Sequence, residues 1–329
     1  MHKTGPGKKS GLEMIIRVWI IYSVICALPA QSCFAAENGR VEIVVDGQRV
    51  VLDMETVEEN AVASDERERQ NAESVSEDIS MQEEMKADDT LMTLLEEVKA
   101  ALPTENGEWS VYICDLIGDY EGCIKEQSMQ AASLIKLYIM GAVYERYDEL
   151  TEIYGKENVD ANLKSMITVS DNEAANTLTG YLGNGDFEKG MCEVSEYCLK
   201  KGFTCTSMGR LLLQNGTAGE NYTSVRDCGR FLKAVYGKDT ETFPHAEEMF
   251  ELLSEQTRRN KIPAQLPDGV LVANKTGELA DVENDAGIIY DTAHDLVLVF
   301  MSQGLTDAAA DQQTIAKISR QIYDFYVSN

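Results

Sequence analysis

The 329-residue chain has few histidines. It contains only His2, His245 and His294. His2 lies in a basic N-terminal stretch, His245 follows a proline as in a loop or a helix start, and His294 lies in a pattern typical of a turn. A Ser-His-Asp triad needs a histidine held between a nucleophile and a carboxylate. The sequence therefore argues against triad chemistry.

Positive charge and paired cysteines are also scarce. The chain has 29 Lys and Arg against 56 Asp and Glu, a formal net charge of −27 at pH 7. Such a surface repels nucleic acid and anionic lipid, so we expect neither as a partner. None of the eight cysteines forms a C-x-x-C pair, which excludes zinc-ribbon and thioredoxin-like sites. We expect no metal and no organic cofactor. Cys114 and Cys123 could face each other across a hairpin, or they could remain buried free thiols.

No apolar run is long enough to span a membrane comfortably. The longest candidate, Val18 to Leu28, follows four basic side chains and ends at Pro29, with small residues through Ala36. This pattern is typical of a secretory signal peptide. We predict a signal peptide over residues 1–35, cleaved after Ala35, and hence a secreted or cell-surface protein. A retained anchor is the alternative.

The next segment lacks the composition of a packed core. Val41 to Leu52 contains Asp46-Gly47 between two apolar runs, which predicts a small hairpin. From Asp53 to Thr90 there are 14 acidic and three basic residues, with no aromatic, glycine or proline, which is typical of a charged linker. We therefore predict a hairpin and acidic linker over residues 36–88 and a globular domain over residues 89–329, acting as a monomer.

The globular part alternates between strand and helix patterns. Apolar residues spaced as on one helix face run from Leu91 to Leu102, and again from Ile315 to Phe325. Between these helices we predict two strands, a mainly helical stretch from Ser133 to about Leu253, and three more strands. The predicted strands are Trp109–Asp115, Cys123–Gln127, Val270–Thr276, Ala286–Asp291 and Leu296–Ser302. This order predicts an α/β (α+β) fold.

Three short motifs follow one another in the globular part. They are Ser133-Leu134-Ile135-Lys136, Ser170-Asp171-Asn172 and Lys275-Thr276-Gly277, and Ser133 is the only serine followed three residues later by lysine. A serine hydroxyl becomes a good nucleophile only when a base takes its proton. Lys136 would share a helix face with Ser133, and burial or a neighbouring cation such as Lys275 would lower its pKa enough for it to act as that base.

These motifs, in this order, resemble those of the penicillin-recognising serine enzymes, most closely the class A β-lactamases. The resemblance covers roughly residues 89–327 and implies a five-stranded antiparallel sheet flanked by helices, with a mainly helical lobe and the active site between them. It implies that Ser133 is acylated, that Lys136 is the base and that Ser170 relays a proton to the leaving nitrogen. Substrate would be bound by Asn172, Lys275, Thr276 and Gly277, the glycine leaving room for it along the strand.

The chain departs from the class A pattern in two places. The span from Lys136 to Ser170 is shorter, and Leu212 stands two residues after Arg210, where the β-lactamases have the glutamate that activates the deacylating water. A leucine cannot deprotonate water. The sequence thus predicts a serine hydrolase that opens β-lactams, or related amides or esters, with slow deacylation. The alternatives are a D-Ala-D-Ala carboxypeptidase or transpeptidase acting on D-alanyl peptides, and a β-lactam-binding sensor module.

Overall fold

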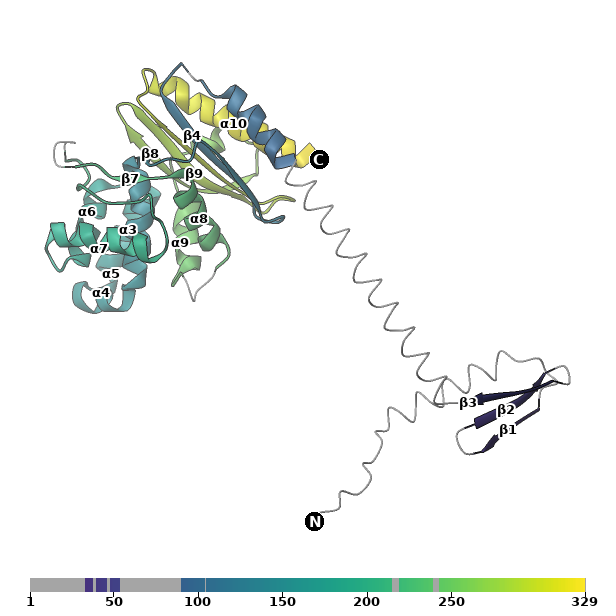
Figure 1. Cartoon of the computed structure of the whole chain (residues 1–329). Coiled ribbons are helices and arrows are strands. Elements are labelled where there is room, and N and C mark those ends of the chain that lie inside the picture. The colour runs from purple at the N-terminus through teal and green to yellow at the C-terminus, as the bar shows by residue number, and fades with distance from the viewer. Residues whose placement is uncertain are drawn as a thin grey trace, which may run out of the picture. The chain divides into compact units, whose positions relative to one another are not determined.

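The computed structural model describes residues 33–37, 40–45, 48–53, 90–103, 105–214, 219–238 and 243–328. The chain divides into two units, Met1–Glu84 and Met85–Asn329, which are drawn in Figure 1. Most of the predicted signal peptide and, apart from Asp53 and Thr90 at its two ends, the predicted acidic linker lie outside the described residues.

The first unit contains a three-stranded antiparallel sheet. Strand β2 (Arg40–Val45) pairs with β3 (Gln48–Asp53) in the register of a hairpin. A third strand that we did not expect, β1 (Cys33–Glu37), pairs with the other edge of β2. This strand spans the position at which cleavage was predicted.

The second unit is built on a five-stranded antiparallel sheet in the order β5-β4-β10-β9-β8. The strands are β4 (Glu108–Asp115), β5 (Tyr120–Ile124), β8 (Leu271–Leu279), β9 (Val282–Tyr290) and β10 (Leu296–Gln303). Figure 1 shows this sheet with helices on its faces. The predicted fold class is therefore confirmed.

The first hairpin of this sheet is tighter than the sequence suggested. We expected the second strand to begin at Cys123, but β5 begins at Tyr120 and pairs directly with Asp115. The Asp115 carboxylate accepts hydrogen bonds from the backbone N–H groups of Ile117 and Gly118 at 2.9 and 3.2 Å. This side-chain turn reverses the chain over residues 116–119, so that Gly118 lies within the turn.

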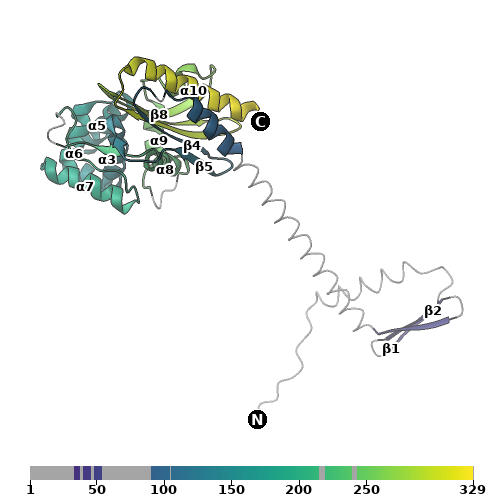
Figure 2. The ribbon, with the colours of Figure 1, turned by 45° about the horizontal axis from the view of Figure 1, so that its top comes forward.

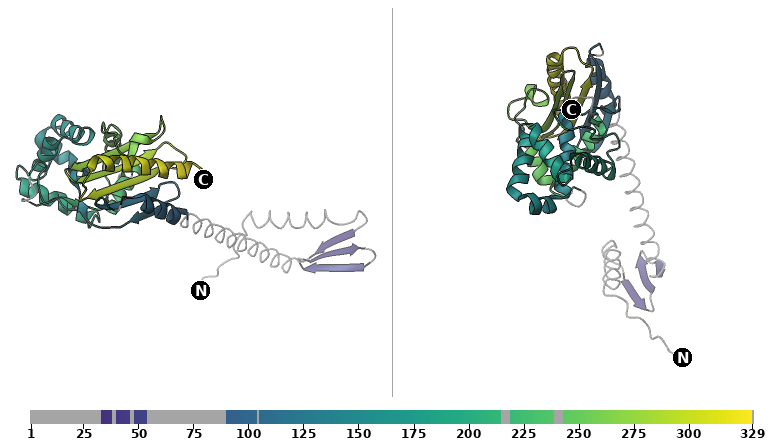
Figure 3. Two further views of the ribbon diagram at one scale, coloured as in Figure 1. Left: turned by 90° about the horizontal axis from the view of Figure 1, so that it is seen from above. Right: turned by 90° about the vertical axis from the view of Figure 1, so that its left-hand side faces the viewer.

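One face of the sheet is covered by two helices far apart in the sequence, the helix over residues 90–101 and α10 (Ala308–Ser328). Figures 2 and 3 show them, blue and yellow, together on that face. Their apolar stripes, including Leu94 and Ile315, pack with Phe300 of β10 in one hydrophobic cluster. The apolar spacing seen in the sequence of these two helices is thus that of a buried helix face.

The opposite face packs against the helical lobe, whose core forms the larger hydrophobic cluster. The lobe and its neighbours comprise β6 (Met129–Gln130), η1 (Ala132–Leu134), α3 (Ile135–Glu145), α4 (Tyr147–Tyr154), α5 (Lys156–Thr168), α6 (Asn172–Leu182), α7 (Phe187–Lys200), β7 (Tyr222–Thr223), α8 (Val225–Tyr236) and α9 (Ala246–Ser254). The short helix η3 (Ile262–Gln265) instead packs with α10 in the first cluster. Among the residues that the structure describes, no helix combines the length and apolar composition that a membrane span requires.

Candidate active site

Ser133 and Lys136 lie at the start of the central helix of the lobe. Ser133 is the middle residue of η1, and Lys136 is in the first turn of α3. Ser133 is half-buried, whereas Lys136 is fully buried. The preceding Ala132 has a φ of 47°, a backbone conformation that L-residues rarely adopt and that is often found at functional sites.

The ammonium nitrogen of Lys136 contacts the second motif directly. Nζ lies 2.7 Å from the Ser170 carbonyl oxygen, 3.2 Å from Ser170 Oγ and 2.7 Å from Asn172 Oδ1. Ser170 has a φ of 61°, and Asp171 caps α6 by accepting a hydrogen bond from the backbone N–H of Ala174. The loop before α6 and the first residue of that helix are thereby held so that Ser170 and Asn172 both contact Lys136.

The third motif reaches the same serine from the sheet. Lys275 on β8 is fully buried, and its Nζ donates to Ser170 Oγ at 2.8 Å and to the Thr276 carbonyl oxygen at 2.7 Å. Ser170 Oγ thus lies between two lysine nitrogens, one from the lobe and one from the sheet. The Thr276 hydroxyl is buried and has no hydrogen-bond partner among the described residues.

Gly277 lets the strand approach the nucleophile turn. A Cβ on Gly277 would lie 3.0 Å from the Ala131 carbonyl oxygen and 3.2 Å from the Ser133 backbone nitrogen. We expected this glycine to leave room for substrate. The structure gives a further reason for it, since a side chain here would push β8 away from the backbone of Ser133.

Burial changes the protonation of both lysines. Burial and the positive charge of Arg258 lower the pKa of Lys136 to about 7, against the opposing effect of Asp171. Burial and the charge of Lys136 hold the pKa of Lys275 well below its usual range. We expected Lys275 to be the cation beside Lys136, and the effect of Lys136 on the pKa of Lys275 shows that the two charges interact. Arg258 is a second cation acting on Lys136, which we did not expect.

The loop after Arg210 is fixed by hydrogen bonds to α6. Asn176 donates to the Leu212 carbonyl oxygen at 3.0 Å and accepts from the Leu212 backbone N–H at 2.9 Å. The side chain of Leu212 is buried in the core of the lobe. Glu220, the nearest carboxylate downstream, is tied to Arg210 (3.0 Å) and to the backbone N–H of Asn221 (2.8 Å). The Arg210–Glu220 pair thus joins the two ends of this loop.

Three residues at the site went unnoticed in the sequence. Glu278 follows the third motif directly, and its side chain pairs with Arg258 and with the fully buried Lys261. Glu278 could have been found from its position beside Gly277. Arg258 and Lys261 could not, because only the folded chain brings the segment after α9 to this strand.

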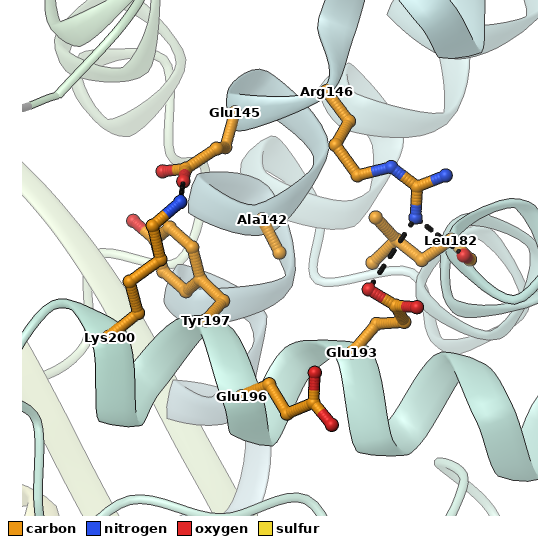
Figure 4. Close-up of a pocket in the computed structure, with 8 residues that line it drawn as sticks. All are labelled: Ala142, Glu145, Arg146, Leu182, Glu193, Glu196, Tyr197 and Lys200. Carbon is orange, nitrogen blue, oxygen red and sulfur yellow. Dashed lines mark hydrogen bonds and ion pairs between the residues drawn. The ribbon is translucent and has the colours of Figure 1, made fainter.

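A separate surface pocket lies between α3 and α7, lined by residues that include Glu145, Arg146, Glu193 and Lys200. Figure 4 shows that these side chains pair with one another, Lys200 with Glu145 and Arg146 with Glu193. None of the three motifs contributes to this pocket. The described residues also contain no group of three or more His, Cys, Asp or Glu side chains arranged to hold a metal ion.

The expected class of protein is supported by a family model. The model described as the Beta-lactamase enzyme family matches residues 158–326. This span is about half of the chain and includes the second and third motifs. The chain belongs to this family, and it is a β-lactamase-like serine hydrolase. No curated protein sequence matches it.

Solved structures share the fold at low sequence identity. PBP-A is 21% identical, with a TM-score of 0.62, over 73% of this chain and 97% of PBP-A. A β-lactamase from Xanthomonas campestris is 20% identical, with a TM-score of 0.59, over 73% of this chain and 98% of that one. A leucine-to-glutamate variant of PBP-A, solved as its acyl-enzyme complex with penicillin G, is 20% identical, with a TM-score of 0.62, over 73% and 98% of the two chains.

Proposed function

We propose that this protein is an acyl-serine hydrolase whose Ser133 is acylated by β-lactams or related amides and esters, and whose acyl-enzyme hydrolyses slowly. One observation carries the proposal: Ser170 Oγ lies 3.2 Å from Lys136 Nζ and 2.8 Å from Lys275 Nζ. Such a chain of buried groups provides a path for a proton between the base and the leaving group.

Acylation follows from these contacts. Because the pKa of Lys136 is about 7, a large fraction of the protein carries a neutral Lys136 at neutral pH. This lysine takes the proton of the Ser133 hydroxyl while Ser133 Oγ bonds to the substrate carbonyl carbon. The C–N bond of the amide then breaks. Ser170 passes its proton to the leaving nitrogen and regains one from Lys136. Asn172 would hold the substrate amide, and the Thr276 hydroxyl, which has no partner among the described residues, would hold the substrate carboxylate.

Deacylation lacks an evident base. Water must attack the ester at Ser133, and a carboxylate that deprotonates it typically contributes about 10²–10⁴-fold. Leu212 stands where such a group would be, and Glu220 is held by Arg210. The leucine at position 212 and the pairing of Glu220 also support a second candidate function, that of a β-lactam-binding sensor that is acylated once and stays acylated.

Turnover distinguishes these functions. With excess chromogenic cephalosporin, the hydrolase releases many equivalents of product after an initial burst, whereas the sensor releases one equivalent and stops. Release of D-alanine from a D-alanyl-D-alanine pentapeptide would instead identify a carboxypeptidase. An enzyme that neither releases chromophore nor forms an adduct with any of these donors would contradict the proposal.

We also propose that the chain is exported, on the strength of the leader pattern, and that it acts as a monomer. The segment between the leader and the catalytic unit should then be dispensable for chemistry. A chain beginning near Asp89 should fold and acylate within about twofold of the mature chain, because both hydrophobic clusters found among the described residues lie after residue 90. Thermal unfolding and acylation rates test this. A shortened chain that unfolds or loses acylation would show that the N-terminal unit completes the fold.

A further inference from the structure

A second surface pocket lies where the last turn of α3 meets α4, α5 and α9. The side chains that line it include Tyr144, Asp160, His245, Glu248 and Glu251. Figure 1 shows α3, α4 and α5 together in the lobe. None of the three motifs contributes a residue to this pocket, so it is separate from the candidate active site.

The pocket wall contains a tyrosine hydroxyl that has no partner. Tyr144 is only 7% exposed, and its hydroxyl makes no hydrogen bond to any described residue. Burial raises the pKa of Tyr144, and the negative charges of Glu248, Asp160 and Glu251 raise it further. The hydroxyl therefore stays neutral and lies in a negative field. A buried polar group of this kind usually has a hydrogen-bond partner, and a ligand in the pocket can supply one.

The two lysines of the pocket do not neutralise it. Lys156 Nζ lies 2.6 Å from the Asp160 carboxylate, and Lys164 Nζ lies 2.7 Å from the Glu255 carboxylate. All four of these side chains line the pocket. Each lysine is thus paired with one carboxylate, and the remaining acidic side chains of the pocket are left without a lysine.

Those remaining carboxylates are both on α9. Glu248 Oε1 contacts His245 Nδ1 at 3.0 Å, whereas the side chain of Glu251 makes no ion pair or hydrogen bond with any described residue. Because Glu248 and Glu251 are three residues apart on a helix, they share one face, and that face lines the pocket. A cation between this face and the Tyr144 hydroxyl would be attracted by two negative charges.

The aromatic rings of the pocket cover one another. The rings of Tyr144 and His245 stack with their centroids 5.1 Å apart, and the ring of Tyr147 lies 4.8 Å from that of His245. The ring of Tyr147 also has Lys156 Nζ 5.2 Å from its centroid. A quaternary ammonium is recognised by open ring faces around it, and these three rings do not offer such a cage. The polar groups of the pocket therefore favour a cation that donates hydrogen bonds.

We propose that this pocket binds a primary alkylammonium group, which donates to the Tyr144 hydroxyl oxygen and to the carboxylates of Glu248 and Glu251. Leu163 and Leu252 also line the pocket, and they can contact the alkyl chain. The ligand class is therefore that of amines and lysine-like side chains. The inference does not depend on acylation of Ser133.

Three small probes of equal chain length test the chemistry of this site. n-Pentylammonium carries the charge and the N–H groups, pentyltrimethylammonium carries the charge alone, and pentan-1-ol carries no charge. Binding to the full-length protein is followed by backbone amide chemical shifts. n-Pentylammonium should bind saturably, with shifts on α9 and the end of α3, and at least about fivefold more tightly than either of the other probes, the equivalent of one hydrogen bond.

Two variants locate the binding groups. Tyr144→Phe keeps the buried ring and removes only the hydroxyl, so it should weaken binding of n-pentylammonium by about fivefold and change that of pentyltrimethylammonium by less than about twofold. Glu251→Gln should weaken binding of both cations by about threefold, because it removes one partly solvated charge. The control is Asp324→Asn, which removes an exposed carboxylate on α10 paired with Arg320 and should leave both affinities unchanged.

The inference is overturned if the parent binds the three probes equally, if its shifts do not saturate, or if both variants bind n-pentylammonium as tightly as the parent. Should Tyr144→Phe fail to fold, as judged by its thermal midpoint, Glu251→Gln carries the test, because Glu251 is exposed. The penicillin adduct at Ser133 should form at the same rate in Glu251→Gln as in the parent. Failure of the amine site would therefore leave the proposed function intact.

Discussion

Replacing Lys136 with arginine should slow acylation of Ser133 by about 10²–10⁴-fold, the usual contribution of a general base. Arginine keeps its proton at every accessible pH, so it would supply the charge of Lys136 without its basicity. The measurement is the rate of adduct formation with benzylpenicillin, followed by intact mass. Lys164→Arg is the control, because Lys164 is exposed and pairs only with Glu255 among the described residues. A Lys136→Arg variant that folds and acylates near the parent rate would reduce the lysine to a structural role.

The pH dependence of acylation follows from the same group. Only neutral Lys136 can accept the proton of Ser133, and its pKa is lowered to about 7. The acylation rate should therefore rise with pH through about 7 and level off above it. A rate that is flat from pH 5 to 9, or that falls over this range, would exclude Lys136 as the base.

The second large effect concerns Leu212. Deacylation should be slower than acylation by about 10²–10⁴-fold, since Leu212 takes the place expected for the base and, among the described residues, the nearby Glu220 is paired with Arg210. Stopped-flow measurements should show a burst near one equivalent followed by a slow steady phase, with an adduct that survives for minutes. Leu212→Glu should restore part of the turnover, because Asn176 fixes the backbone of this residue on both sides.

The adjacent leucine provides the control for that variant. Leu213 is 69% exposed, so Leu213→Glu adds the same charge without burying it at the site, and it should not shorten the life of the adduct. Rapid turnover without a burst in the parent protein would contradict the slow deacylation. Glu220 would not explain such turnover unless its pair with Arg210 opened, so Lys136 would become the candidate for activating the water.

Regular patterns allowed much of the fold to be predicted. The apolar faces near Leu94 and Ile315 marked the two helices that cover the sheet, and alternating runs marked the strands. The strand ends were less accurate. Strand β9 begins at Val282, four residues before the predicted start, because Glu283 and Asp285 are buried there by pairing with Lys261 and with the backbone N–H of Ile262. From the sequence alone, charged residues such as Glu283 and Asp285 predict an exposed loop and not a buried strand.

The candidate site was predictable as far as its motifs extended. Ser133, Lys136, Ser170 and Lys275 could be named from spacing and order, and the structure brings the last three into direct contact. The effect of Arg258 on the pKa of Lys136 could not be predicted, because it depends on tertiary proximity between residues more than a hundred positions apart. The pair that ties Glu220 to Arg210 was also hidden, because a spacing of ten residues in a loop predicts no contact.

The central claim, that Ser133 forms the acyl-enzyme, is tested most directly by intact-mass measurement after incubation with benzylpenicillin, with peptide mapping of the product. We predict a single adduct with the mass of the whole penicillin on the peptide that contains Ser133, and none in Ser133→Ala. An adduct on another residue, or an equal adduct in Ser133→Ala, would contradict the account.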